Sequence, residues 1–534
     1  MSGHNNNIQQ QVKAKIAERG IDYKQKRSDL ASIAENSLPA YASVSAKARN
    51  YLDQGVICDL FEGAAPYRAR YILPDYQKFL RQGCNYLNLP PAHDIHSAIN
   101  YLQILYHYVP SIIDHPVYLG SIDELLSPWE KSVSRDELKR VLKYFIMHIN
   151  RTFPSAFVHM NLGPKDSLTS RLWLELEGEL ELAIPNLSFK YHRGVTPDDL
   201  LELALTTAMK ASKPYIVDDE KIASMWKELA GEGESKREEE VEYGVASCYN
   251  TLRIGGGSHT LVRLNLREAA TKSSMKAGDI TLFLEEVVPE AVAALAEIIN
   301  YRASFLVEES GFFANSFLAR EGLIDLKKFT SMGGVVGLHE CVEILSGGGR
   351  MGWQENAKDR LATDYAETII QTIASKLSLH PGKYCDGSNG KITLHAQSGI
   401  DTDLGTTAGV RIQIGKEPTL FAQMNLAARL QKYFTSGVSD IYVFEPGAKD
   451  NLQGLASIVK KGIDKGIRIL SINNSSSDCV RVTGYLVKKS EVERYWKKES
   501  LRDESLRFGA PTLKNANILG RKVRSTKENK EDNE

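Results

Sequence analysis

The sequence predicts an α/β fold, built as a barrel or as a wound sheet, with a mainly helical N-terminal region. Beyond residue 260, stretches rich in β-branched and apolar residues predict strands, and helical patterns fill most of the gaps between them. This alternation favours an α/β architecture. The expected strands cover residues 260–266, 333–338, 391–397, 409–414, 439–445 and 467–474.

Helical periodicity dominates the first two hundred residues. Ser134 stands three residues before Glu137, which predicts a capping box at the start of one helix. Thr196 as N-cap, followed by Pro197, predicts the start of another. The most apolar long stretch, 280–310, carries several glutamates and one proline, so it predicts a buried helix pair and not a membrane span.

Composition argues against several classes of protein. The 66 Lys and Arg residues balance 67 Asp and Glu residues in a chain of 534, so nothing steers it toward nucleic acid or an anionic membrane. Its first residues lack the apolar segment of a secretory signal, which predicts a cytoplasmic location. The six cysteines form no C-x-x-C pair, so we expect neither a metal site nor a disulfide framework.

Gly484 interrupts a strand-like segment near the end of the sequence. Glycine can lose an α-hydrogen and become planar at Cα without a side-chain clash, and the radical is delocalised over the flanking amide and carbonyl. Such a radical needs a thiol partner, because S–H and α-C–H bonds have similar strengths. Cys248, on a predicted loop, supplies one. The alternatives are a β-bulge glycine and a buried core thiol.

The segment RVTGY, residues 481–485, resembles the RVxGY signature of glycyl radical enzymes, which that family also carries near its C-terminus. The resemblance extends from about residue 25 to residue 490, and the chain closely resembles the YjjI family of glycyl radical proteins. The stretches that carry it are EGAAPYRARYILPDY (62–76), VASCYNTL (245–252), LHAQSGIDTDLGTT (394–407) and VRVTGYLVKKS (480–490).

This resemblance implies an α/β barrel whose interior receives two finger loops, one with Cys248 and one with Gly484. It implies that Gly484 stores a radical, installed by a separate radical-SAM activating enzyme with an iron–sulfur cluster and S-adenosylmethionine. Cys248 would become a transient thiyl that takes hydrogen from a small organic substrate under anaerobic conditions. No tightly bound cofactor is expected, and a homodimer is possible.

The sequence departs from the known reactions of the wider superfamily. Tyr249 follows Cys248, where pyruvate formate-lyase-like members have a second cysteine. Asn250 stands where dehydratase-like members have a glutamate base. The zinc cysteines of anaerobic ribonucleotide reductases are absent from the sequence. The substrate is therefore not predicted, and the alternatives are a ribonucleotide reductase-like activity or a non-catalytic protein with the same fold.

We expect four regions along the chain. Residues 1–230 would form the mainly helical N-terminal part of the barrel domain, and 231–470 the α/β core with the cysteine loop. Residues 471–512 would be the glycyl radical segment, and 513–534 a charged, disordered tail.

Further site candidates follow from their positions in predicted elements. Glu340, beside His339 at a strand-to-helix junction, is either a catalytic base or only a partner of the helix dipole. His395 ends a strand and could titrate near neutrality. We expect Tyr249, Asn250 and His395 to contact the substrate.

Other conspicuous residues favour structural roles. Cys479 lies close to Gly484, but a packing role is favoured. Arg68, Arg70 and Asp75 either bind substrate or, as we favour, lock their loop onto the barrel. Two glycine-rich turns fit no phosphate-binding motif, which argues against a nucleotide site.

Overall fold

The computed structural model describes most of the chain between residues 2 and 499. The described residues are 2–18, 23–35, 43–59, 68–111, 115–153, 157–231, 241–247, 249–272, 280–346, 353, 360–396, 405–438, 440–474, 476–481, 486–497 and 499. Cys248, Gly484, the predicted tail and most of the acidic segment 231–244 lie outside them.

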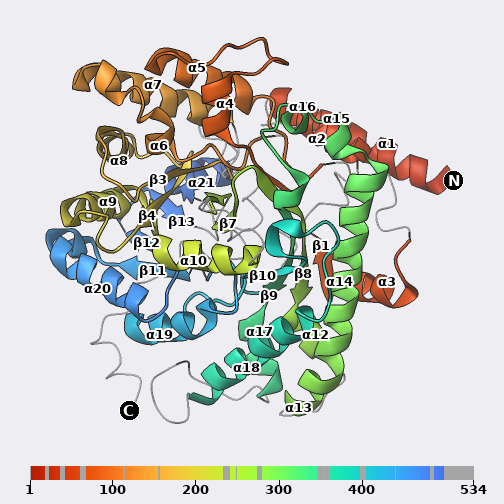
Figure 1. Cartoon of the computed structure of the whole chain (residues 1–534). Coiled ribbons are helices and arrows are strands. Elements are labelled where there is room, and N and C mark those ends of the chain that lie inside the picture. Colours follow the sequence, from red (N-terminus) through yellow and green to blue (C-terminus); the bar gives the residue numbers. More distant parts are fainter. Residues whose placement is uncertain are drawn as a thin grey trace.

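Two five-stranded sheets organise the molecule (Figure 1). In the first sheet, β1, β8, β9 and β10 lie in that order, and β2 pairs with another part of β8. Its strands are β1 (Ile57–Asp59), β2 (Tyr71–Leu73), β8 (Gly256–Asn265), β9 (Phe329–Val336) and β10 (Thr393–Ala396).

The second sheet has the order β11, β12, β5, β4, β3, and only the β12–β5 pairing is antiparallel. Its strands are β3 (His159–Leu162), β4 (Asn186–Tyr191), β5 (Tyr215–Asp218), β11 (Asp440–Phe444) and β12 (Ile469–Asn474). It therefore joins strands from both sides of residue 230. The sequence patterns identified β11 and β12 but not β3, β4 or β5.

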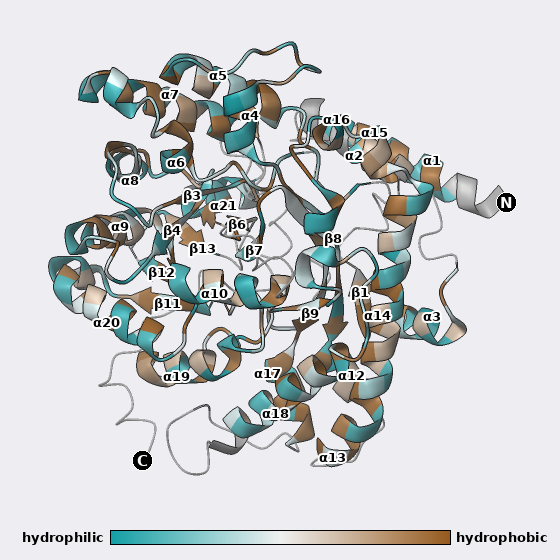
Figure 2. Cartoon of the chain, viewed as in Figure 1, coloured by the Kyte–Doolittle hydropathy of each residue, from teal (hydrophilic) through white to brown (hydrophobic). Residues whose placement is uncertain are grey.

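Helices cover the outer faces of both sheets. In Figure 2 most carry both brown and teal residues, as expected of helices that cover a core on one side. They are α1 (Ser2–Ala17), α2 (Tyr23–Glu35), α3 (Ala46–Asp53), α4 (Tyr76–Gln82), α5 (Ile95–Tyr106), α6 (Ile122–Leu126), α7 (Arg135–Thr152), α8 (Leu168–Leu180), α9 (Asp198–Ala211), α10 (Asp219–Ala230), α12 (Leu266–Lys272), α13 (Ile280–Leu282), α14 (Val288–Ser304), α15 (Phe312–Asn315), α16 (Phe317–Arg320), α17 (Leu338–Leu345), α18 (Arg360–Leu377), α19 (Leu420–Gln431), α20 (Leu452–Asp464) and α21 (Lys489–Trp496).

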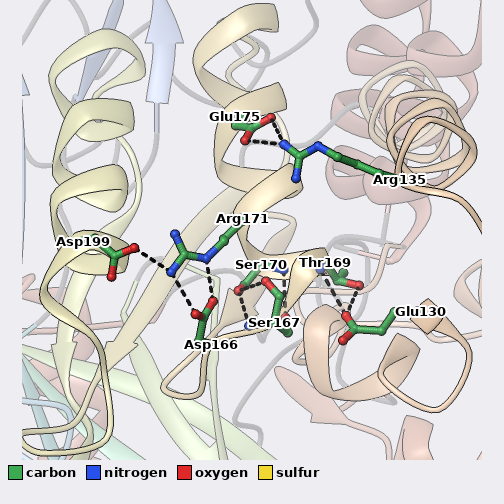
Figure 3. A network of polar contacts seen from close by, with 9 residues as sticks. All are labelled: Glu130, Arg135, Asp166, Ser167, Thr169, Ser170, Arg171, Glu175 and Asp199. Carbon is green, nitrogen blue, oxygen red and sulfur yellow. Dashed lines mark hydrogen bonds and ion pairs between the residues drawn. The ribbon is translucent and has the colours of Figure 1, made fainter.

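The ends of the outer helices α7, α8 and α9 are joined by polar contacts (Figure 3). Arg171 of α8 binds Asp166 just before the helix and Asp199 of α9. Arg135 of α7 pairs with Glu175 of α8 at 2.9 Å. All are partly exposed, and such pairs typically contribute about 0–1 kcal/mol each, so they align the helices more than they stabilise the fold.

Two predictions on helices were wrong. The stretch 280–310 is one continuous helical run, α13–α14 with a π-helical turn at each end of α14, and not a helix pair. The first π-turn directly precedes Val288 and Pro289, so the helix continues past the proline. The N-cap of α9 is Pro197 and not Thr196, whose hydroxyl donates to the Pro164 carbonyl.

One predicted strand, 409–414, is absent from the described structure. Gly409 has a φ of +56°, and the amide of Arg411 donates to the Ala408 carbonyl, so the backbone turns there. Val410 and Ile412 are nevertheless buried in the core beneath the first sheet. Their alternation reflects this burial and not strand pairing. By contrast, half of the capping box predicted at Ser134 is present: the Ser134 hydroxyl accepts from the Glu137 amide, whereas the Glu137 carboxylate accepts from Arg140.

Candidate functional site

The segment around Cys248 forms an antiparallel hairpin, here called the cysteine hairpin. Its strands are β6 (Tyr243–Ala246) and β7 (Asn250–Arg253), and Ala246 and Asn250 are the last pair before the tip. Ser247 begins the tip with a φ of +58°, in the left-handed region. Cys248 itself lies outside the described residues; in the sequence it stands between Ser247 and Tyr249.

Side chains of the second sheet hold the β6 strand of the cysteine hairpin. Asn161 on β3 accepts from the Val245 amide at 2.8 Å and donates to the Val245 carbonyl at 2.9 Å. Lys190 on β4 donates to the Tyr243 carbonyl at 3.0 Å. His159 Nδ1 donates to the Ser247 carbonyl, one residue before Cys248.

The end of β10 in the first sheet and the loop between α19 and β11 hold the other side of the same hairpin. The Tyr249 hydroxyl donates to the Ala396 carbonyl at the end of β10. The Tyr249 ring stacks on His395, with centroids 5.1 Å apart and planes 13° apart. The Thr251 amide donates to the Ser436 hydroxyl at 2.8 Å. The cysteine hairpin therefore lies between the two sheets and is held from both.

One row of residues crosses the first sheet on the face that meets the hairpin. Arg263 of β8 and His395 of β10 both pair in register with Gly334 of β9. Directly paired residues share a face. The neighbouring Val262 and Leu394 point instead into the core beneath α14 and α18. Gly334, which has no side chain, thus lies between a buried arginine and a buried histidine on the inner face.

Asn250 closes the tip of the cysteine hairpin. Its side-chain amide donates to the Ala246 carbonyl at 3.3 Å. Its Oδ1 is buried and accepts no hydrogen bond from the part of the chain that the structure describes. An unsatisfied buried acceptor is unfavourable, so this atom is suited to a donor group brought by a ligand.

The RVTGY segment also belongs to a hairpin, here called the glycine hairpin. Its strands are β13 (Cys479–Arg481) and β14 (Leu486–Lys488), and Arg481 pairs with Leu486. The single strand with an interior glycine that the sequence suggested is therefore wrong. Gly484 belongs to the connection 482–485, which lies outside the described residues.

The glycine hairpin is anchored at the ends of α8 and α9 and on β12. The Ser212 hydroxyl donates to the Cys479 carbonyl at 2.7 Å, and Arg481 donates to the Ser212 carbonyl at 2.5 Å. Asn473 accepts from the Arg481 amide at 3.3 Å. The Cys479 thiol, fully buried, donates to the Glu181 carbonyl, which supports the packing role expected for Cys479.

A stack of three side chains joins the two hairpins. The Arg481 guanidinium lies over the Tyr215 ring, 3.8 Å from its centroid. The Tyr215 ring stacks on His159, with centroids 5.9 Å apart and planes 13° apart. His159 in turn binds the Ser247 carbonyl. Arg481 is three residues before Gly484 and Ser247 directly precedes Cys248, so the two predicted reactive positions follow the two ends of one stack.

His159 is held neutral in this stack. Burial lowers its pKa to about 3, and the charges of Arg481 and Lys213 act in the same direction, against the hydrogen bond to Ser247. Since Nδ1 donates to the Ser247 carbonyl, Nε2 is the acceptor and takes the hydrogen bond from the Ser188 hydroxyl at 2.8 Å.

His339 and Glu340 lie in the first turn of α17, which follows β9 after Gly337, as expected. Both carboxylate oxygens of Glu340 accept from Thr407, one from its amide at 3.0 Å and one from its hydroxyl. Glu340 thereby ties the 405–411 loop to the start of α17. His339 is buried, stacks on Trp353 and lies 3.2 Å from Glu343, and burial lowers its pKa.

The aromatic loop near residue 70 shows mainly structural contacts. Asp75 caps α4 by accepting from the Lys78 amide at 2.7 Å. The Arg70 amide donates to the His259 carbonyl, and its guanidinium lies over the Tyr71 ring. Arg68 is buried beside them. These contacts support the locking role.

Within the described ranges, no three His, Cys, Asp or Glu side chains lie close enough together to hold a metal ion. No described helix is both long and apolar enough to cross a lipid bilayer.

Several residues of the site were missed by sequence reasoning. They are His159, Asn161, Tyr215 and Arg263, and all are buried. The pattern LVRLNL contained a usable signal, because an arginine in the middle of an apolar strand is unusual unless it faces a polar interior. His159 and Tyr215 gave none, since an isolated ring in a short strand is most often core.

Solved structures of glycyl radical enzymes share this fold. The hydroxyproline dehydratase of Clostridioides difficile, solved with trans-4-hydroxy-L-proline bound, matches with a TM-score of 0.68 at 12% identity, over 97% of this chain and 88% of that one. The anaerobic ribonucleotide reductase of Thermotoga maritima, solved with dATP and CTP, matches with a TM-score of 0.65 at 11% identity, over 93% and 96%. The predicted glycyl-radical-enzyme type of α/β barrel fold is thus confirmed.

Sequence relatives place the chain more narrowly. The model of the YjjI-like glycyl radical enzyme family matches residues 21–524. The YjjI protein of Escherichia coli (strain K12) is 38% identical over 98% of this chain and 97% of its own length. A protein of Haemophilus influenzae is 35% identical over 96% and 97%. The chain therefore belongs to the YjjI-like family of glycyl radical enzymes, and the predicted resemblance is confirmed.

Proposed function

We propose that the chain is a radical enzyme in which Gly484 stores the radical and Cys248 delivers it to a small organic substrate. The observation that supports this most strongly is the convergence of the two hairpins. Arg481 and Ser247, which flank the connections containing these residues, are joined through Tyr215 and His159. A protein without radical transfer would need neither hairpin in this interior position.

The proposed chemistry begins when the Gly484 Cα radical takes the hydrogen atom of the Cys248 thiol. Gly484 regains its second α-hydrogen, and Cys248 becomes a thiyl. The thiyl takes a hydrogen atom from a substrate carbon, and the substrate radical rearranges or fragments. The product radical takes a hydrogen atom from the Cys248 thiol, which becomes a thiyl again. This thiyl then takes one α-hydrogen from Gly484 and so restores the glycyl radical. Each transfer moves one hydrogen atom and the last one restores the Gly484 radical, so the cycle consumes no external oxidant or reductant.

Tyr249, Asn250 and His395 would form the substrate side of the site. Tyr249 and Asn250 follow Cys248 directly, and the stack of Tyr249 on His395 places both rings on the inner face of the first sheet. The buried Asn250 Oδ1 would accept a hydrogen bond from a substrate hydroxyl or amine. An amide is not a base at neutral pH, so Asn250 would orient the substrate and not remove a proton.

The proposed base role of Glu340 has a structural condition. Both oxygens of this carboxylate accept hydrogen bonds from Thr407, so Glu340 would have to release one of them before it could take a proton from a substrate. The same contacts would let Glu340 position the 405–411 loop beside the site.

Installation of the Gly484 radical would require a partner. We expect a radical-SAM activating enzyme, with an iron–sulfur cluster and S-adenosylmethionine, that removes one α-hydrogen from Gly484 in the anaerobic cytoplasm. Support comes from the family assignment, since glycyl radical enzymes depend on such activation. A ribonucleotide reductase-like activity shares the fold, but the sequence lacks the paired cysteines of the zinc site.

Electron paramagnetic resonance of anaerobically activated protein tests the proposal. Wild type and Cys248→Ser should both give the doublet of a glycyl radical, since one α-hydrogen remains on the radical carbon. Gly484→Ala should give none. In a metabolite screen, only wild type should convert a compound. A radical in Gly484→Ala, or conversion by Cys248→Ser, would overturn the assignment.

A further inference from the structure

We infer that Arg481, Tyr215 and His159 form a positioning stack that sets the distance between the glycine hairpin and the cysteine hairpin. The inference rests on the proposed roles of Gly484 and Cys248 and names the device that brings them within reach. None of the three side chains would touch the substrate. Each would act through the hairpin that it holds.

Both ends of the stack are fixed to backbone close to the reactive positions. At one end, the Arg481 guanidinium donates to the Ser212 carbonyl while its own amide donates to Asn473. At the other end, His159 holds the Ser247 carbonyl, and Ser188 holds His159. Because these bonds involve buried groups, a shift of either hairpin would break them at substantial cost.

The middle of the stack is made of flat groups in contact. Arg481 lies 3.8 Å from the centroid of Tyr215, a cation–π geometry that a guanidinium satisfies better than an ammonium because it is planar. Tyr215 and His159 lie 13° from parallel. Three flat groups in series behave as a spacer: shortening the central ring would let the hairpins approach or tilt, whereas removing only its hydroxyl would preserve the spacing.

The stack also explains why the histidine must stay neutral. A protonated His159 would face the guanidinium of Arg481 across one ring, and Lys213 adds a further positive charge. Among the acidic groups on packed elements, Glu177 pairs with Lys213 at 2.6 Å, and Asp123 of α6, which packs on β3, accepts from the Gly163 amide. Neutral His159 keeps Nδ1 as a donor to Ser247 and Nε2 as an acceptor from Ser188.

Hydrogen exchange at Gly484 reports the distance between the two tips without any substrate. In D₂O the Cys248 thiol carries deuterium. The Gly484 radical takes that deuterium, and Cys248 becomes a thiyl. When the thiyl then removes the original hydrogen, a deuterated glycyl radical remains and the resonance doublet collapses. The rate of collapse depends on how closely the two hairpins are held.

The experiment follows this collapse in activated full-length protein. In wild type and in Tyr215→Phe, which keeps the ring, the doublet should collapse at similar rates. In Tyr215→Leu the radical should form, but collapse should slow by about tenfold to a hundredfold, the effect expected when reacting groups are displaced by about 1 Å. Arg481→Lys should slow it as well, and serves as the second variant if Tyr215→Leu does not fold.

Two controls separate this effect from general damage. Phe145→Leu removes another buried ring, stacked on Tyr106 in the outer helices, and should exchange at the wild-type rate. Cys248→Ser should keep its doublet, which shows that exchange requires the thiol. Wild-type exchange rates in both Tyr215→Leu and Arg481→Lys, or a stable doublet in wild type, would overturn the positioning stack. A wild-type protein without any glycyl signal would instead overturn the proposed function, and the stack with it.

Discussion

The two hairpins differ in how the fold holds them. Contacts from both sheets hold the cysteine hairpin. Asn161 and Lys190 of the second sheet bind β6. On the other side, Tyr249 of the hairpin donates to the Ala396 carbonyl of the first sheet, and the Thr251 amide donates to Ser436. The bonds that anchor the glycine hairpin come from one side of the molecule: β12 and the ends of α8 and α9. The described strands of the cysteine hairpin are therefore held between the two sheets, whereas those of the glycine hairpin are held from the side of β12, α8 and α9.

The segment that anchors the glycine hairpin contains a buried ion pair. Lys213 follows Ser212, which holds the glycine hairpin, and its ammonium lies 2.6 Å from Glu177 with both side chains fully buried. Glu177→Gln should destabilise the protein by about 3–5 kcal/mol, because it leaves a buried charge uncompensated. Thermal and denaturant unfolding measure this.

The matched control for that variant is Glu175→Gln, two residues earlier on the same helix. It breaks the partly exposed pair with Arg135 seen in Figure 3 and should cost less than about 1 kcal/mol. Equal losses in the two variants would show that the Lys213 pair contributes no more than a surface contact.

The cysteine hairpin is held to the second sheet by two hydrogen bonds between the Asn161 side chain and the backbone of Val245. Asn161→Leu should leave both the amide and the carbonyl of Val245 unsatisfied, at a cost of about 2–5 kcal/mol. Asn473→Leu leaves only the Arg481 amide unsatisfied and should cost about 1–3 kcal/mol. Denaturant titrations of the two variants compare the hairpins directly. A larger loss of stability for Asn473→Leu would show that the glycine hairpin is held more firmly than the cysteine hairpin.

Acid should lower the free energy of unfolding through protonation of His159, which links the two hairpins. The folded pKa of His159 is about 3, below its ordinary value of 6.5, so the unfolded chain binds the proton first. Stability attributable to His159 is therefore present above pH 6.5 and is lost as the pH falls from 6.5 toward 3. From pH 7 to pH 5 the loss is about 2 kcal/mol.

His159→Gln should show a correspondingly shallower dependence of stability on pH over that interval. The measurement is the unfolding free energy of wild type and variant at several pH values. Parallel curves would mean that His159 does not titrate in this way.

The smallest effect concerns the contact of the cysteine hairpin with the first sheet. Tyr249→Phe removes the hydroxyl that donates to Ala396 but keeps the ring stacked on His395. We expect a loss of about 1 kcal/mol. Tyr249→Leu, which also removes the stack, should lose more in the same unfolding assay. Equal losses would show that the stack contributes nothing.

Part of the fold and of the candidate site could be predicted from the sequence, and part could not. Strands β8 to β12 stood out because their apolar runs are bounded by turn residues, and Cys248 and Gly484 stood out because their neighbours form a recognisable pattern. The strand predicted at 409–414 failed because alternating burial occurs in an irregular loop as well. His159 and Tyr215 could not be found, since their roles depend on contacts between segments far apart in the sequence.

Exposure of activated protein to air tests the central claim most directly. A carbon-centred backbone radical combines with dioxygen, and the peroxyl product breaks the chain at that residue. Mass spectrometry should find a long fragment ending at Thr483 with a remnant of Gly484, together with the fragment 485–534, in activated wild type and in activated Cys248→Ser. Unactivated protein should stay intact. Activated protein that survives air whole, or breaks elsewhere, would contradict a radical at Gly484.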